Sequence, residues 1–259
     1  MAEAARQIGI QMYTLRDQTE RDFLGTLGKV AEMGYQVVEF AGYFGVSAAV
    51  LRRRLDELEL AAPSAHVGLD FSSLNQMERA LAREIEYAAE LGIQYIITPS
   101  APLPPSPSID DVTRIIPYLE KASAMVRAAG MQYGYHNHDY EFAEVDGKAV
   151  IDIWLERIPA EHMLAEFDLG WVHRGGANPA HYVSRYAGRV PLVHIKDFGA
   201  NQEETDLGKG EVDFQSVFEI AEQSGILYYI VEQEAYEVSS LASAKLALDY
   251  FRRLGLMHS

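Results

Sequence analysis

Eight short runs of strand-forming residues alternate with amphipathic segments along this chain. Several of the segments between the runs carry apolar residues at helical spacing. Four helical segments reach a glycine just before the next run, which is typical of a helix C-terminus, at Gly34, Gly92, Gly130 and Gly225. We therefore expect strands at 8–13, 36–41, 62–67, 95–100, 131–136, 163–168, 190–197 and 227–233, and helices including 23–34, 49–60, 81–92 and 112–130.

This alternation predicts an α/β fold, a single (β/α)8 TIM barrel. The first expected strand is not followed by the glycine-rich loop of a dinucleotide-binding doubly wound sheet. A length of 259 residues suits one barrel, so residues 1–259 are expected to form one domain. The proline-rich stretch 99–108 is short enough to be one rigid loop after the fourth strand.

The chain contains no cysteine, so any metal ion must be held by His, Asp and Glu. That donor set favours Mn, Mg, Co, Fe or Zn. The N-terminal residues lack the features of a secretory signal, and no apolar run approaches the roughly 18 residues needed to span a bilayer. We therefore expect a cytoplasmic protein.

The formal net charge of −16 comes from acidic residues spread along the whole chain. Such a surface repels phosphate backbones and anionic lipid, so neither nucleic acid nor a membrane is an expected partner. The expected partner is a small molecule.

In a TIM barrel, the residues at the C-terminal ends of the strands share one mouth. This rule brings together polar residues that are distant in sequence and embedded in apolar runs, where a lone charge would be costly to bury. They are Tyr13, Glu39, His66, the run from His136 to Glu141, Asp168, His194, Lys196, Asp197, Glu232 and Glu234. A shared cation would satisfy several of them at once.

Several of these residues also have structural interpretations. His66 could be a hydrogen-bonded core histidine, Glu39 could pair with an arginine across the barrel, and Asp168 could cap a helix. Glu166 lies two residues before Asp168 and shares its strand face, so it belongs to a deeper layer where a structural ion pair suits it.

Carboxylates combined with an imidazole can form an octahedral metal site with two open positions. Such a site suits the neighbouring oxygens of a hydroxy-ketone or an enediol. The metal stabilises the enediolate while side chains move the proton, which is the chemistry of isomerisation and epimerisation.

Six motifs spread over the chain resemble the sugar phosphate isomerase/epimerase family, the xylose-isomerase-like TIM barrels. They are IGIQMYTLRD, SAHVGL, YHNHDYEF, FDLGWVHRGG, GRVPLVHIKDF and IVEQE. The resemblance extends from residue 8 to about residue 250 and implies a barrel with one divalent metal ion. It is specific for the superfamily and does not define the substrate.

In metal-dependent epimerases of this superfamily, Glu, Asp, His and Glu from strands five to eight hold the cation. By resemblance, Asp168, His194 and Glu232 match the last three positions. The fifth strand departs from the pattern, because His136-Asn137-His138 stands where many members have Glu-Asn-His. Glu141 is expected to supply the missing carboxylate, with His136 as the alternative ligand or as a proton-transfer base.

The hypothesis is a divalent-metal-dependent isomerase or epimerase of a ketose, keto-sugar or sugar derivative. His136, Glu141 and Glu232 are the expected catalytic residues, and manganese is among the expected metals. The expected pocket residues are Tyr13, Glu39, His66, Arg174 and Lys196; alternatively, Arg174 fastens a loop and Lys196 pairs with Asp197 or Glu234.

Two other functions stay open. The same site could serve a lyase or dehydratase acting on a keto-inositol or a 3-keto-glycoside, or the barrel could bind sugar without turnover. DNA repair is disfavoured, because the sequence has Trp171 where relatives of endonuclease IV carry a histidine. A homo-oligomer through Trp171, Tyr182 and Tyr186 is an option, although these residues would look the same if they packed inside the barrel.

Overall fold

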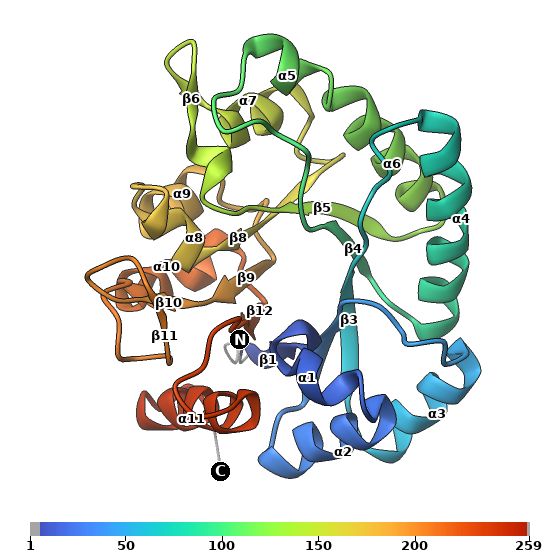
Figure 1. Cartoon of the computed structure of the whole chain (residues 1–259), viewed down its shortest axis with the longest axis vertical. Helices are drawn as coiled ribbons and strands as arrows, with labels where there is room; N and C mark the ends of the chain where they lie inside the picture. The colour runs from blue at the N-terminus through green and yellow to red at the C-terminus, as the bar shows by residue number, and fades with distance from the viewer. Residues whose placement is uncertain (1–5, 258–259) are drawn as a thin grey trace.

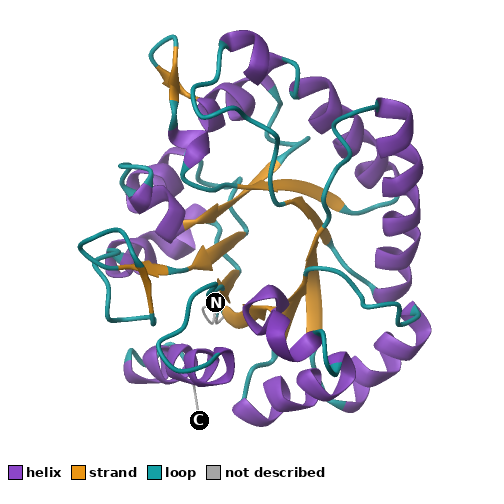
Figure 2. Cartoon of the chain, viewed as in Figure 1, coloured by secondary structure: helices purple, strands orange, loops and turns teal. Residues whose placement is uncertain are grey.

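The computed structural model describes residues 6–257, and its centre is a closed barrel of eight parallel strands (Figures 1 and 2). The strands follow one another around the barrel in the order β1-β12-β9-β8-β5-β4-β3-β2. Their bounds are β1 (Gln7–Gln11), β2 (Val37–Phe40), β3 (Ala61–His66), β4 (Tyr95–Thr98), β5 (Gln132–His136), β8 (Leu164–Asp168), β9 (Leu192–Ile195) and β12 (Tyr228–Val231). All eight match expected strands, so the predicted fold is confirmed.

Helices form the outer ring of the barrel (Figure 2). They are α1 (Arg16–Thr19), α2 (Phe23–Met33), α3 (Ala48–Glu57), α4 (Leu74–Leu91), α5 (Ile109–Thr113), α6 (Ile116–Ala128), α7 (Val150–Arg157), α8 (Leu169–Arg174), α9 (Pro179–Arg185), α10 (Phe214–Ser224) and α11 (Ser240–Arg253), with the short 3-10 helices η1 (Met12–Leu15) and η2 (Tyr140–Phe142). In the described range, none of these helices has both the length and the apolar character needed to cross a bilayer.

Two small hairpins lie in loops beyond the barrel strands. One pairs β6 (Glu144–Val145) with β7 (Lys148–Ala149), and the other pairs β10 (Asp197–Phe198) with β11 (Glu204–Thr205). The second loop is fixed by Asp197, whose carboxylate accepts hydrogen bonds from the backbone N–H groups of Phe198, Gly208, Gly210 and Val212.

The expected glycine stops are confirmed. Gly34, Gly92 and Gly225 cap α2, α4 and α10 with φ of 104°, 77° and 81°, in the left-handed region that glycine adopts at little cost. The expected helix 112–130 is wrong, because the chain forms α5 and α6 with a break at 114–115. Pro117 lies in the first turn of α6, where its missing N–H leaves no helical hydrogen bond unmade.

The inside of the barrel is layered, because alternate residues of each strand face inward. The bottom layer is apolar and contains Val37, Tyr95, Ile97, Leu192 and Ile230. Nearer the C-terminal ends of five strands, the buried residues are polar: Gln11, Glu39, His136, Glu166 and His194. The apolar layer therefore closes the barrel beneath a buried polar layer.

Gly9 gives the apolar layer its close packing. An added Cβ at this position would lie 2.8 Å from Ile230 Cδ1 and 2.8 Å from Val37 Cγ1. We expect Gly9→Ala to lower the free energy of unfolding by about 1–3 kcal/mol, measured by urea denaturation followed by tryptophan fluorescence. Gly68→Ala is the matched control, since an added Cβ there meets nothing within 4 Å. Equal stability of the two variants would contradict this account of the packing.

Candidate functional site

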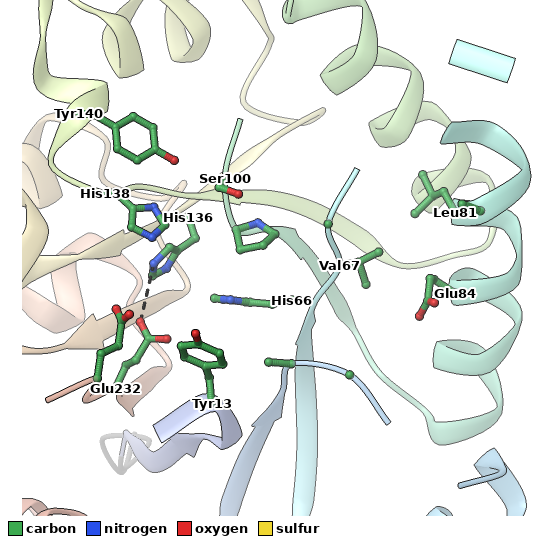
Figure 3. A pocket seen from close by; sticks show the side chains of 16 residues that line it. Tyr13, His66, Val67, Leu81, Glu84, Ser100, His136, His138, Tyr140 and Glu232 are labelled. Atoms are coloured by element: carbon green, nitrogen blue, oxygen red, sulfur yellow. Dashed lines mark ion pairs between the residues drawn. The ribbon is translucent and has the colours of Figure 1, made fainter. Parts of the chain in front are cut away.

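A cavity of about 640 Å³ lies at the C-terminal ends of the barrel strands (Figure 3). His66 and His136 are the last residues of β3 and β5, and Glu232 directly follows β12. The cavity is lined by Tyr13, Ala41, Gly42, His66, Val67, Gly68, Ala80, Leu81, Glu84, Pro99, Ser100, His136, His138, Tyr140, Glu232 and Glu234. This is the mouth at which the strand-end rule places a TIM-barrel active site.

Four side chains at one side of this cavity form a compact group of possible metal ligands, which we call the upper group. His136, Asp168, His194 and Glu232 each offer one ligand atom, and these atoms all lie within 4.8 Å of one another. All four residues are buried. They come from β5, β8, β9 and the end of β12, which are neighbours in the barrel.

The two carboxylate oxygens of Asp168 differ in their hydrogen bonding. Oδ1 accepts a hydrogen bond of 2.9 Å from the N–H of Trp171 and so caps α8, as the alternative interpretation of the sequence expected. Oδ2 is buried without a hydrogen-bond partner among the described residues. An unpartnered buried carboxylate oxygen beside three other possible ligands fits the requirements of a cation site.

The two histidines of the upper group each face a carboxylate on both sides. His194 has Nδ1 at 3.1 Å from Glu232 Oε2 and Nε2 at 2.6 Å from Glu39 Oε1. His136 has Nε2 at 3.8 Å from Glu232 Oε2 and Nδ1 at 3.3 Å from Glu166 Oε2. Each ring therefore presents one nitrogen to the upper group while the other faces a deeper carboxylate. This is the arrangement of carboxylate-oriented metal histidines.

Below the upper group, His66 joins the two deeper carboxylates. Its Nε2 lies 3.1 Å from Glu39 Oε1 and 2.7 Å from Glu166 Oε2. Gln11 Nε2 donates a hydrogen bond of 2.8 Å to the same Glu39 oxygen. We call Glu39, His66 and Glu166 the lower layer. The ion pair expected for Glu166 is present, and Glu39 pairs with histidines rather than with an arginine.

The charges of the lower layer compensate one another. Burial alone would lower the pKa of His66, but Glu39 and Glu166 raise it to about 10, so the ring carries a positive charge at neutral pH. Burial would likewise raise the pKa of Glu39, but His66 and His194 hold it well below its ordinary value. The lower layer is thus a buried network of ion pairs. It keeps two unpartnered oxygens, since Glu39 Oε2 and Glu166 Oε1 have no hydrogen-bond partner among the described residues, and burial raises the pKa of Glu166 to about 7.

In the upper group, Glu166 and Glu39 raise the pKa of His194 well above its ordinary value, and Lys196 holds the pKa of Glu232 well below its own. These two residues therefore carry opposite charges, and a metal ion would have to displace the proton of His194.

Burial raises the pKa of Asp168 to about 7, against the opposing charge of Lys196. Burial, together with the neighbouring His194 and His66, holds the pKa of His136 well below its ordinary value. A neutral imidazole is the form that binds metal, and a carboxylate that burial makes hard to ionise is one that a divalent cation would stabilise.

Lys196 borders the upper group from the side away from the cavity. Its ammonium lies 3.3 Å from Glu232 Oε2 and 3.7 Å from Asp168 Oδ2, and it forms a closer ion pair with Glu234. The Nζ atom also lies 4.7 Å from the centre of the Trp171 ring. The expected alternative pairing with Glu234 is therefore present, and the ammonium is buried among carboxylates instead of lining the cavity.

The structure places Glu141 outside the upper group. Its Oε1 accepts a hydrogen bond of 2.6 Å from the Tyr135 hydroxyl, and its Oε2 accepts one of 2.8 Å from the N–H of His138. Both oxygens are thus used within the β5 loop, and Glu141 does not line the cavity. The expected position of this residue as a metal ligand does not match this geometry.

The other expected pocket residues divide into two sets. Tyr13 and His66 line the cavity, whereas Glu39 is fully buried beneath it. Arg174 Nε pairs with Asp139 at 3.2 Å and its guanidinium lies 5.0 Å from the Trp171 ring centre, so this residue fastens the β5 loop to α8, as the alternative interpretation expected. Tyr182 and Tyr186 both donate to Asp152, which satisfies their hydroxyls within the chain.

Some cavity residues were given no role from the sequence. His138 and Tyr140 lie at one wall, with their rings stacked at 5.3 Å, in the loop after β5. Both belong to the run from His136 to Glu141 that was expected at the mouth. Leu81 and Glu84 reach the cavity from α4, where nothing in the helical pattern marks them.

The closed barrel and its polar, strand-end cavity define the class: a TIM barrel with an active-site-like mouth. Within this class, the family described as xylose isomerase-like TIM barrel matches residues 27–254. The chain belongs to this family, and the expected family resemblance is confirmed.

Two of the similar proteins are inosose dehydratases. An inosose dehydratase of Geobacillus kaustophilus is 24% identical over 88% of this chain and 86% of its own length. An inosose dehydratase of Lacticaseibacillus casei is 25% identical over 54% of each chain.

Solved structures show the same fold. A sugar phosphate isomerase/epimerase from Parabacteroides distasonis superposes with a TM-score of 0.86 at 24% identity, covering 99% of this chain and 97% of that one. An L-ribulose 3-epimerase superposes with a TM-score of 0.77 at 20% identity, covering 97% and 94%.

Glu141 should make stability depend on pH. Burial raises its pKa from 4.5 to about 7, so the folded protein holds a proton that the unfolded chain releases between these values. The free energy of unfolding should therefore fall as pH rises from about 4.5 to about 7, by at most about 1.4 kcal/mol per pH unit. Glu141→Gln should lack this contribution. Urea denaturation of both metal-free proteins at pH 5, 6 and 7 measures the difference, and parallel pH profiles would contradict it.

Proposed function

We propose that this chain is a divalent-metal-dependent isomerase or epimerase of a ketose, a keto-sugar or a related sugar derivative. The observation that carries the proposal is the upper group: four buried ligand atoms beside a cavity that can hold a sugar. Its neighbours in fold include an epimerase, and the family to which the chain belongs is described as xylose isomerase-like.

The ligand set of the proposal is His136, Asp168, His194 and Glu232. His136 replaces Glu141 as the ligand from β5, because His136 Nε2 points to the group and both Glu141 oxygens are already hydrogen-bonded. Two imidazoles and two carboxylates favour Mn, Fe, Co or Zn over Mg. When bound, such an ion would polarise the substrate carbonyl and acidify the neighbouring C–H bond.

In this proposal, side chains that line the cavity transfer the proton. With His136 as a ligand and Glu141 outside the cavity, the acid–base candidates are Glu232 and His138. Burial lowers the pKa of His138 and its Nδ1 has no hydrogen-bond partner among the described residues, so the ring is neutral and free to accept a proton. Its stacking on Tyr140 holds the ring in place.

A second candidate is a dehydratase or lyase that uses the same site. The inosose dehydratases among the relatives favour it. Both reactions begin by removing a proton next to a carbonyl, and they differ in whether the carbon is reprotonated or a neighbouring hydroxyl leaves. The same cavity residues would serve either reaction.

Metal content is the first test. After loading with Mn and dialysis, we expect about one metal ion per chain by inductively coupled plasma mass spectrometry. Asp168→Asn and His136→Ala should lose the ion because each removes a proposed ligand. Glu141→Gln should keep it and is the matched control. Retention of the ion by both ligand variants would refute the proposed site, and its loss in Glu141→Gln alone would restore Glu141 as the ligand.

The reaction class is tested with the loaded protein in deuterium oxide. An epimerase or isomerase should introduce deuterium into a ketose substrate, detected by NMR, and Asp168→Asn should abolish the exchange. Formation of an unsaturated or dehydrated product from a keto-inositol would establish the second candidate. Absence of both reactions over a panel of keto-sugars would favour a barrel that binds sugar without turnover.

Glu39 should control the affinity for the metal without touching it. Its carboxylate faces His194 Nε2 at 2.6 Å and so orients Nδ1 toward the upper group. We expect Glu39→Gln to weaken Mn binding by about 10- to 100-fold, measured by competition with a fluorescent chelator. Gln11→Ala is a control for disturbance of this layer, because it removes a neutral hydrogen bond to the same carboxylate, together with the one that Gln11 Oε1 accepts from the Tyr13 N–H. Unchanged affinity in Glu39→Gln would exclude an orienting role.

A further inference from the structure

The cavity extends well beyond the upper group. From His136 and Glu232 it reaches across the barrel mouth to α4, where Leu81 and Glu84 project toward it one helical turn apart (Figure 3). None of the possible ligand groups includes a residue of α4. This far end therefore has no part in holding a metal ion.

Glu84 is an unpaired acid among the described residues, and it lies partly buried at the wall of the cavity. Within residues 6–257, its carboxylate forms no hydrogen bond or ion pair with another side chain, although many exposed acids of this chain do. Partial burial raises its pKa, which shows that solvent access is reduced at this end of the cavity. A hydrogen bond to a ligand is stronger there than on an open surface.

The walls around Glu84 are apolar. Leu81 and Val67 are buried, and Ala80 and Gly68 complete this end of the cavity. An apolar wall with one carboxylate matches the two aspects of a pyranose ring, which has C–H faces and a hydroxyl rim. The wall packs against a face of the ring and the carboxylate accepts from neighbouring hydroxyls.

The volume is larger than one sugar requires. With roughly 30 Å³ for each of about 12 heavy atoms, the spacing of liquid water, a hexose takes at most about 360 Å³. The cavity measures about 640 Å³. A single ring bound at the upper group would therefore leave the α4 end open.

We propose that Val67, Gly68, Ala80, Leu81 and Glu84 form a second sugar subsite, which we call the α4 subsite, and that the substrate is a glycoside whose non-reacting ring binds there. The proposal rests on the proposed function for the position of the reacting sugar. In it, Glu84 is a specificity residue that takes no part in the reaction.

The test compares one sugar ring with two. Isothermal titration calorimetry with the Mn-loaded protein uses D-fructose as the single ring, and turanose, maltulose and palatinose as ketoses carrying a glucosyl group at O3, O4 or O6. At least one disaccharide should bind about 10-fold or more tightly than fructose. Glu84→Ala should remove about 10-fold of that affinity and leave fructose binding within about twofold. Glu86→Ala is the matched control, an exposed acid on the same helix that does not line the cavity.

Three results would overturn the α4 subsite. In the first, the disaccharides bind no more tightly than fructose or do not bind. In the second, Glu84→Ala weakens the binding of fructose and of the disaccharide equally. In the third, Glu86→Ala has the effect expected of Glu84→Ala. Glu84→Gln, which keeps the shape of the side chain, repeats the test if the alanine variant is unstable. Because binding is measured directly, failure of the proposed reaction would appear as tight disaccharide binding without deuterium exchange, and failure of the subsite as exchange without the gain in affinity.

Discussion

The buried contact between imidazoles and carboxylates inside the barrel is the interaction on which the rest of this site depends. Glu39 and Glu166 cost free energy to bury, and the positive charge of His66 between them offsets that cost. The apolar layer below keeps water away from the network, which strengthens each contact. His194 is held at Nε2 by its hydrogen bond to Glu39, whereas His136 Nδ1 lies 3.3 Å from Glu166 Oε2 without a hydrogen bond among the described residues.

The same contacts hold the upper group together, but they do not pair every polar atom in it. Asp168 Oδ2 has no hydrogen-bond partner among the described residues, as is also true of Glu39 Oε2 and Glu166 Oε1 in the lower layer, and Glu232 shares Lys196 with Glu234. A divalent ion would add to a framework whose ring orientations are already set, so little side-chain entropy would be lost on binding. Lys196 makes the site less negative, and so limits how strongly the carboxylates repel one another when the ion is absent.

Periodicity was enough to predict the barrel. The eight strands were found because buried parallel strands are short apolar runs, and Asp168, His194 and Glu232 were expected at the mouth because they interrupt such runs at strand ends. The position of Glu141 was beyond the sequence, because sequence distance does not show that η2 turns its carboxylate toward Tyr135, on the outer face of β5. The division of labour between the nitrogens of His136 was likewise beyond the sequence, since it depends on which carboxylates other strands place at each side.

The two halves of the barrel have separate roles, and strand order explains the division. β5, β8, β9 and β12 are consecutive around the barrel and supply every member of the upper group. The opposite half contributes the loops after β2, β3 and β4, with Ala41, Val67 and Pro99, and beyond them α4 with Glu84. The four possible ligands thus stand on rigid strand ends, while the shape of the distal cavity is set by loops and a helix face. Changes in those loops or in α4 could alter the distal cavity without moving the upper group, so one fold can accommodate different ligands.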